Sequence, residues 1–184
     1  MKKLFFFGCL TLIAASSQAQ EIWGFSVPLL DGNQSVPPTG SIAYGSGAFT
    51  INEFFNMRVT GSISITGIDV NEVTGMHIHH APVGQNGPVI FDILANLKEA
   101  NQGVGTSNFF FTGTLQGDGN LTAQQKLAVM VAGNAYVNVH TTEFPTGEIR
   151  GQIVCVVPEP ASIVAVGLGL GSLLLLRRRK VTSS

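Results

Sequence analysis

Short runs of alternating apolar and polar residues fill the middle of the chain, and they predict β-strands. Val137 and Val139 alternate with polar neighbours, and a period of two is typical of a strand with one buried face. The same pattern recurs at Phe25, Val27 and Leu29; at Phe55, Met57, Val59, Ile63 and Ile65; at Phe109, Phe111 and Leu115; and at Ile149, Gly151 and Ile153. Glycines and asparagines separate the runs, and almost no room is left for crossover helices. The sequence therefore predicts an all-β fold, an antiparallel β-sandwich or Greek key.

One or two short helices are expected among these strands. Thr122 and Gln125 form a capping-box pattern, and the residues that follow as far as Ala132 are compatible with a helix. Gly133 can then end that helix in a left-handed conformation. A second helical turn is predicted over residues 93–100.

The N-terminus has the pattern of a secretory signal peptide over residues 1–19. Lys2 and Lys3 precede a short apolar segment, residues 4–15, which is expected to form a signal helix. Ser17-Gln18-Ala19 is a small-x-small cleavage site, so signal peptidase would leave a chain that begins at Gln20. A lipoprotein signal through Cys9 is less favoured, because almost no apolar region precedes that cysteine. Removal of the signal leaves Cys155 as the only cysteine, so the exported domain has no intramolecular disulfide.

The C-terminus combines three elements in a fixed order over residues 158–180. Pro158, Glu159 and Pro160 are followed by sixteen apolar or small residues, 161–176, and then by the basic cluster Arg177, Arg178, Arg179 and Lys180. A helix over 161–176 would be about 24 Å long, which is short for a hydrocarbon core of about 30 Å. The basic cluster would stay cytoplasmic and place residues 20–157 outside. An ordinary permanent tail anchor is one interpretation.

That order of elements resembles the PEP-CTERM sorting signal of bacterial envelope proteins. The resemblance implies that an exosortase-type enzyme recognises the Pro-Glu-Pro sequence and processes the tail. The protein would then be anchored only transiently in the inner membrane, and it would end in the cell envelope or outside the cell. Intact mass separates this interpretation from the permanent anchor.

Charge is distributed unevenly between the ends and the middle. Residues 20–157 hold four basic and ten acidic residues, a net charge of 4 − 10 = −6, whereas the other six basic residues lie at the two ends. Nucleic-acid binding requires a basic surface that replaces phosphate counterions, so it is not expected for this domain.

All four histidines lie in two of the predicted strands. His77 and His79 project from one face of the first strand, and His140 shares a face with Tyr136 and Asn138 on the second. Glu148, Arg150 and Gln152 share a face on a third strand, which we expect to pair with the second. His77, His79 and His140, with His80 as a further candidate, could bind copper or zinc. Alternatively, the same histidines form a hydrogen-bonded polar layer with Tyr136, Asn138, Glu148 and Arg150 that sets strand register.

Four stretches of the middle segment resemble the CHRD domain, the module repeated in chordin and present singly in bacterial secreted proteins. In order, they are residues 30–39 (LDGNQSVPPT), residues 77–79 with 84–89 (HIH and GQNGPV), residues 132–141 (AGNAYVNVHT) and residues 145–152 (PTGEIRGQ). One residue departs from the family pattern, since Ser35 stands where the family usually has Glu. The resemblance implies an immunoglobulin-like β-sandwich in an extracellular setting, and it implies no settled biochemical activity.

Two functions are consistent with these observations. The first is a secreted, exosortase-sorted CHRD domain that acts without catalysis or cofactor as a structural or binding protein of the envelope or exopolysaccharide matrix. Its support is the two resemblances together with a sequence that contains no Ser-centred elbow, HExxH motif or Gly-rich phosphate loop. The alternative is a copper- or zinc-binding domain, including an enzyme similar to copper-zinc superoxide dismutase, which also has a His-x-His strand.

Overall fold

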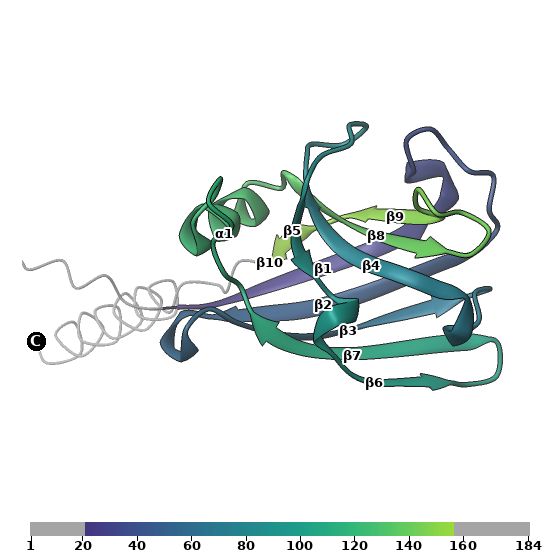
Figure 1. Cartoon of the computed structure of the whole chain (residues 1–184), viewed down its shortest axis with the longest axis horizontal. Coiled ribbons are helices and arrows are strands. Elements are labelled where there is room, and N and C mark those ends of the chain that lie inside the picture. Colours follow the sequence, from purple (N-terminus) through teal and green to yellow (C-terminus); the bar gives the residue numbers. More distant parts are fainter. Residues whose placement is uncertain (1–20, 157–184) are drawn as a thin grey trace, which may run out of the picture.

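The computed structural model describes residues 21–156, which form an antiparallel β-domain with one α-helix (Figure 1). The strands are β1 (Ile22–Asp31), β2 (Tyr44–Asn52), β3 (Arg58–Thr66), β4 (Val73–His80), β5 (Val89–Asp92), β6 (Leu97–Gln102), β7 (Thr106–Thr114), β8 (Ala135–Thr141), β9 (Ile149–Gln152) and β10 (Val154–Val156). The helix α1 spans Ala123–Val131, and 3₁₀ turns occupy Gly32–Gln34, Glu53–Phe55, Val70–Glu72 and Leu94–Asn96. The signal peptide predicted over 1–19 and the sorting signal predicted over 158–180 lie outside the described residues.

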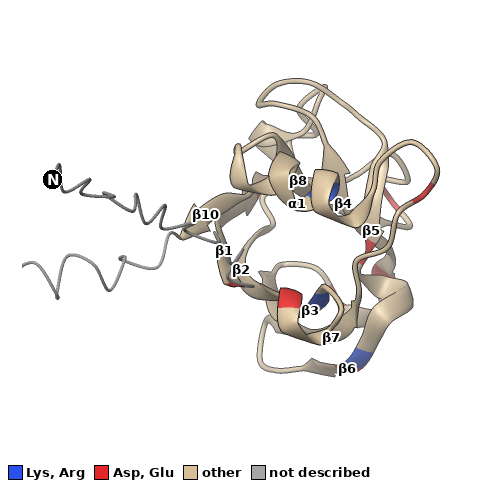
Figure 2. Ribbon diagram, turned by 90° about the vertical axis from the view of Figure 1, so that its left-hand side faces the viewer, with Lys and Arg blue, Asp and Glu red and all other residues tan. Residues whose placement is uncertain are grey.

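All the strands belong to one sheet that curls over on itself. Its order is β5-β4-β8-β9-β1-β2-β3-β7-β6, β10 pairs with β1, and every pair is antiparallel. Viewed from the end, β4 and β8 lie in one layer and β3, β7 and β6 in the other (Figure 2). The prediction of an all-β antiparallel sandwich is therefore confirmed, with two layers that are continuous through β9 and β1.

Aromatic and aliphatic side chains fill the space between the two layers. The Phe25 and Phe49 rings stack with centroids 5.0 Å apart, and Phe111 packs 6.4 Å from both Phe49 and Phe91. Met76 and Ile78 of β4 contribute fully buried side chains from the opposite layer. Burial of one face of β4 and of β8 in this core fixes the register between the two strands, and therefore which side chains face outward.

Two residues that the alternation placed in the core, Leu29 and Phe55, are exposed because the backbone is irregular near them. A register shift in β1 between Val27 and Leu30 turns Leu29 outward, with 46% of its surface exposed, and buries Leu30 instead. The shift adds one residue to β1 that has no partner in β2, so the residues after it point to the opposite face from the one that simple alternation predicts. Phe55 belongs to a 3₁₀ turn and is also exposed, because β3 begins only at Arg58.

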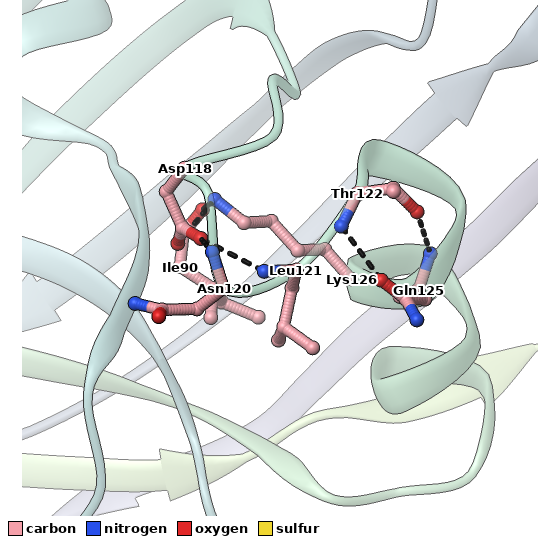
Figure 3. Close-up of polar contacts among 7 residues, drawn as sticks. All are labelled: Ile90, Asp118, Asn120, Leu121, Thr122, Gln125 and Lys126. Atoms are coloured by element: carbon pink, nitrogen blue, oxygen red, sulfur yellow. Dashed lines mark hydrogen bonds and ion pairs between the residues drawn. The ribbon is translucent and has the colours of Figure 1, made fainter.

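The first helix prediction is confirmed, whereas the second is only partly right. The Thr122 hydroxyl accepts from the Gln125 backbone N–H at 3.2 Å, the Gln125 side chain accepts in return, and Gly133 has a φ of 72° (Figure 3). The predicted turn over 93–100 is a 3₁₀ turn at Leu94–Asn96, but the residues from 97 onward form strand β6. Pairing of β6 with β7 supplies backbone hydrogen bonds that an isolated helical turn would lack.

A buried lysine attaches α1 to the sheet. Lys126 is only 4% exposed, and its Nζ donates to the Ile90 carbonyl oxygen at 3.1 Å and lies 3.0 Å from Asp118 Oδ2 (Figure 3). The backbone N–H of Leu121 and the Lys126 ammonium group lower the pKa of Asp118 to about 2. The pairing satisfies a charge that could not otherwise be buried, and it fixes α1 beside β5.

Within residues 21–156 no helix has the length and apolar character needed to cross a membrane.

Candidate metal centre and neighbouring polar cluster

Three imidazoles meet on the outward face of β4 and β8. Strand alternation sends Met76, Ile78, Val137 and Val139 into the core, so the residues between them face outward. His77 and His79 of β4 and His140 of β8 each offer one nitrogen, and the three nitrogens lie within 4.8 Å of one another. The His77 ring lies 5.1 Å from the His140 ring and 5.7 Å from the His79 ring, centroid to centroid. The structure thus brings together the three metal ligands that the sequence suggested.

The other nitrogen of each ring faces an oxygen acceptor. His79 Nδ1 lies 2.9 Å from the Gly87 carbonyl oxygen, and His140 Nδ1 lies 2.9 Å from the Pro145 carbonyl oxygen. His77 Nε2 lies 3.7 Å from Asp92 Oδ2. A carbonyl oxygen only accepts, so both Nδ1 atoms carry hydrogen, and in the neutral ring Nε2 then presents a lone pair. Oxygen acceptors behind the ligating rings are the usual outer shell of protein metal sites.

Two of the nitrogens that face the other rings are buried, and within residues 21–156 they have no hydrogen-bond partner. They are His77 Nδ1 and His79 Nε2. A buried polar atom without a partner costs free energy, and a metal ion is one species that uses such a lone pair. These two atoms therefore fit an added ligand such as a metal ion.

Burial favours the neutral, metal-binding form of His77 and His79. Removal from water lowers the pKa of His77, an effect that Asp92 partly opposes. Burial likewise lowers the pKa of His79, against the raising effect of its hydrogen bond to Gly87. Because protonated imidazole cannot ligate a metal, the lowered pKa values would allow a metal to bind at more acidic pH.

Gly75 makes room for the rings. It lies on β4 opposite His140, and a Cβ atom there would be 3.0 Å from His77 Cε1 and 3.3 Å from His140 Cδ2. The ligand nitrogens of a tetrahedral zinc site are about 3.3 Å apart, given bonds of about 2.05 Å. The three nitrogens lie within 4.8 Å of one another, so the rings would have to turn toward a common centre to reach that spacing. The donor set and the space around it therefore fit copper or zinc.

A second group of predicted residues continues the row of side chains across β8 and β9. The Tyr136 ring stacks on His79 with centroids 5.0 Å apart, and the guanidinium carbon of Arg150 lies 3.5 Å from the Tyr136 ring centroid. Gln152 accepts from Arg150 at 3.4 Å. The Tyr136 hydroxyl also accepts from the Gly87 backbone N–H at 3.2 Å. Of the polar layer that the sequence offered as an alternative, Tyr136 and Arg150 therefore lie in a row beside His79.

Asn138 and Glu148 differ in how close they come to the histidines. The Asn138 amide is 3.5 Å from His140 Nε2 and 3.4 Å from the Thr146 carbonyl oxygen. Glu148 instead accepts from the hydroxyls of Ser41 and Thr141, both at 2.7 Å. Through Thr141 the Glu148 carboxylate is bonded to β8, the strand that carries His140, but within the described residues it bonds none of the three histidines.

His80 lies apart from the three histidines, and Arg150 contacts the loop that follows β4. His80 is not part of the three-histidine group, because strand alternation turns it to the opposite face from His79. Arg150 does not bond β4 itself. It donates to the carbonyl oxygens of Pro82 and Gln85 in the loop that follows β4.

Several residues of the site were not identified from the sequence. Gly75 carries a local signal, since it precedes His77 by two residues and therefore shares its face. Asp92 and the carbonyl oxygens of Gly87 and Pro145 carry no such signal, because strand pairing and loop closure bring them to the rings. At the position where the family usually has Glu, the Ser35 hydroxyl donates to the Glu148 carbonyl oxygen at 3.2 Å.

The fold and site define an antiparallel β-sandwich with a histidine cluster on one outer face. The CHRD domain matches residues 26–153, and the PEP-CTERM protein-sorting motif matches residues 156–180. The chain belongs to the CHRD domain family, since the match covers well over half of its length. The sorting motif indicates an exported, envelope-associated protein that an exosortase processes. Neither the curated proteins nor the solved structures contain a match to this chain.

Proposed function

We propose that this CHRD domain is a non-enzymatic binding protein of the cell envelope or extracellular matrix, and that it binds one copper or zinc ion. The observation that carries the proposal is the convergence of His77, His79 and His140, whose nitrogens lie within 4.8 Å of one another. The orientation of the rings supports it, since each directs its other nitrogen toward an oxygen atom. Three neutral imidazoles would leave a coordination position of the metal for water or another ligand.

The charge of the exported domain favours a cation. Residues 20–157 carry a net charge of −6, so a divalent cation is attracted to the domain. Imidazole ligands suit copper and zinc better than magnesium or calcium, which prefer oxygen. Asp92 supplies a carboxylate behind His77 and would raise the basicity of that ligand.

The export route forms the second part of the proposal. Signal peptidase removes residues 1–19, the apolar segment 161–176 holds the chain transiently in the inner membrane, and exosortase then processes the tail. The matched sorting motif supports the exosortase step of this proposal, and the exopolysaccharide matrix is one destination consistent with it. We expect the intact mass of the exported protein to correspond to an end near Pro158. A mass that includes residues 161–184 would establish a permanent anchor instead.

Metal analysis of the purified chain, without a histidine tag, tests the binding function. We expect one copper or zinc ion per chain, lost in His79→Ala and retained in His80→Ala. The second variant is a matched control, because His80 belongs to the same strand but faces away from the site. Equal metal content in both variants, or a folded wild-type chain that takes up no copper or zinc, would contradict the proposal.

A dismutase assay tests the alternative enzymatic function. On our proposal, the copper-loaded chain disproportionates superoxide no faster than the same amount of copper bound to a small imidazole complex. A faster rate that His79→Ala removes and His80→Ala leaves intact would instead establish an enzyme similar to copper-zinc superoxide dismutase.

A further inference from the structure

Arg150 is a buried cation without a carboxylate partner among the described residues. Its side chain lies under the loop that follows β4, and only 2% of the residue is exposed. Nη1 donates to the Gln85 carbonyl oxygen at 2.7 Å, and Nη2 donates to the Pro82 carbonyl oxygen at 3.1 Å. Burial lowers the pKa of Arg150, yet a guanidinium remains charged at neutral pH. Buried charges are usually paired with an opposite charge, whereas within residues 21–156 Arg150 has only carbonyl and amide oxygens and the Tyr136 ring as partners.

Two of the five guanidinium N–H groups have no acceptor in residues 21–156. The bonds to Gln85, Pro82 and Gln152 use Nη1 once and Nη2 twice. Nε–H and the second N–H of Nη1 therefore remain. Tyr136 covers one face of the guanidinium group, so an acceptor must approach along its edge.

A cavity of about 90 Å³ adjoins this arginine. Arg150 lines it together with Ser35, Pro37, Asn86, Asn138 and Gly147, and no carboxylate is among the lining residues. Glu148 is close in sequence, but its carboxylate is bonded to Ser41 and Thr141. The Asn86 amide donates to the Val36 carbonyl oxygen and joins the two loops that form the walls. The space is several times what one water molecule needs.

We infer that this pocket binds a small oxyanion, a carboxylate or phosphate group, through Arg150. The charge of the arginine, the two remaining N–H donors and the absence of a lining carboxylate all favour an anion. The inference goes beyond the proposed metal function, because the Tyr136 ring lies between Arg150 and the metal ligand His79.

The test uses acetate and inorganic phosphate as probes on the purified chain, stripped of metal by a chelator. The stripped chain separates the result from the metal proposal, since no anion can then bind through a metal ion. We expect one equivalent of probe to bind in calorimetry and to shift the Arg150 Nε–H resonance in a ¹H–¹⁵N spectrum. Binding of phosphate alone indicates a phosphate group as the natural ligand, and binding of acetate indicates a carboxylate.

Two variants decide whether Arg150 is responsible. Arg150→Gln should weaken probe binding at least about tenfold, as expected for the loss of a charge-assisted hydrogen bond. Arg58→Gln is the matched control, because Arg58 is an exposed arginine on β3 and should leave binding unchanged. Equal weakening in both variants would show non-specific surface attraction and overturn the inference.

Ser35 provides a second test if Arg150→Gln does not fold. Ser35→Glu would place a carboxylate in the cavity as an internal counter-ion and should abolish probe binding, whereas Ser35→Ala should retain it. Wild-type binding in Ser35→Glu would overturn the inference. So would the absence of saturable binding of either probe to the wild-type chain up to ~10 mM.

Discussion

Gly75→Ala tests the geometry of the metal centre without removing any proposed ligand. The added Cβ atom would be 3.0 Å from His77 Cε1 and 3.3 Å from His140 Cδ2. Carbon atoms pack at about 3.5–4.0 Å, so the His77 ring must move by a few tenths of an ångström. Metal–ligand distances in proteins hold to about 0.2 Å. We therefore expect metal affinity to fall at least about tenfold, or ~1.4 kcal/mol.

Comparing the free energy of unfolding with and without metal distinguishes a loss of metal binding from a general loss of stability. At a free metal concentration of 100 times the wild-type Kd, metal stabilises the wild-type chain by about 2.7 kcal/mol. A variant with tenfold weaker binding gains only about 1.4 kcal/mol at that concentration, a difference of about 1.3 kcal/mol. Without metal the variant should differ from wild type by no more than about 1 kcal/mol, because alanine also restricts the unfolded chain.

Urea unfolding with and without metal, together with a competition titration against a chelator, measures both quantities. Gly24→Ala is the matched control, since it adds a methyl group to a strand where the nearest contact is an ordinary 3.4 Å to the Val156 carbonyl oxygen. Gly24→Ala should bind metal as the wild type does. If Gly75→Ala also retained wild-type affinity, the three histidines would not form the metal site that we propose.

Three further predictions concern pH, a helix cap and a loop. Because burial lowers the pKa of His77 and His79 below 6.5, the unfolded chain binds more protons than the folded chain at mildly acidic pH. The metal-free chain should therefore lose stability in urea titrations as the pH falls below 6.5. Thr122→Ala removes the α1 cap and should lower the free energy of unfolding by about 1 kcal/mol. Gly147 has a φ of 118°, and a Cβ atom there would overlap the Asn138 amide, so Gly147→Ala should cost more than about 2 kcal/mol in the same assay.

Each of these predictions has a definite contrary result. Stability that is constant or increasing from pH 7.5 to 5.5 would contradict the pH prediction. A Thr122→Ala variant as stable as the wild type would show that packing alone holds α1. Gly103→Ala, at a glycine with only a 3.4 Å contact to the Thr106 carbonyl oxygen, is the control for Gly147→Ala. Equal costs at the two glycines would contradict the steric argument.

Local patterns determined much of the fold before any tertiary contact was known. Alternation placed Val137 and Val139 in the core and Tyr136 and His140 on the other face, as the structure shows. The capping box at Thr122 located the helix start correctly. These features depend on residues within a few positions of each other, so their physical cause is contained in the local sequence.

Pairing between distant segments decided the rest. The predicted helical turn over 93–100 becomes strand from Leu97 onward because β7 offers backbone partners, and Leu29 turns outward because of the register shift in β1. The residues near 97 do not indicate that β7 will pair with them, and the residues near 29 do not indicate the register against β2. The departures therefore occur where a non-local hydrogen-bond ladder overrides local preference.

For the candidate site, the sequence alone supplied the ligand types and the faces of their strands. It placed His77 and His79 together because residues two apart in a strand share a face. Only the tertiary structure decided that β4 and β8 pair with His140 opposite Gly75, which brings the three nitrogens within 4.8 Å. It also supplied the carbonyl oxygens that orient the rings, and the cavity beside Arg150. Strand register and loop closure are non-local, so the distances that turn separate histidines into one site exist only in the folded chain.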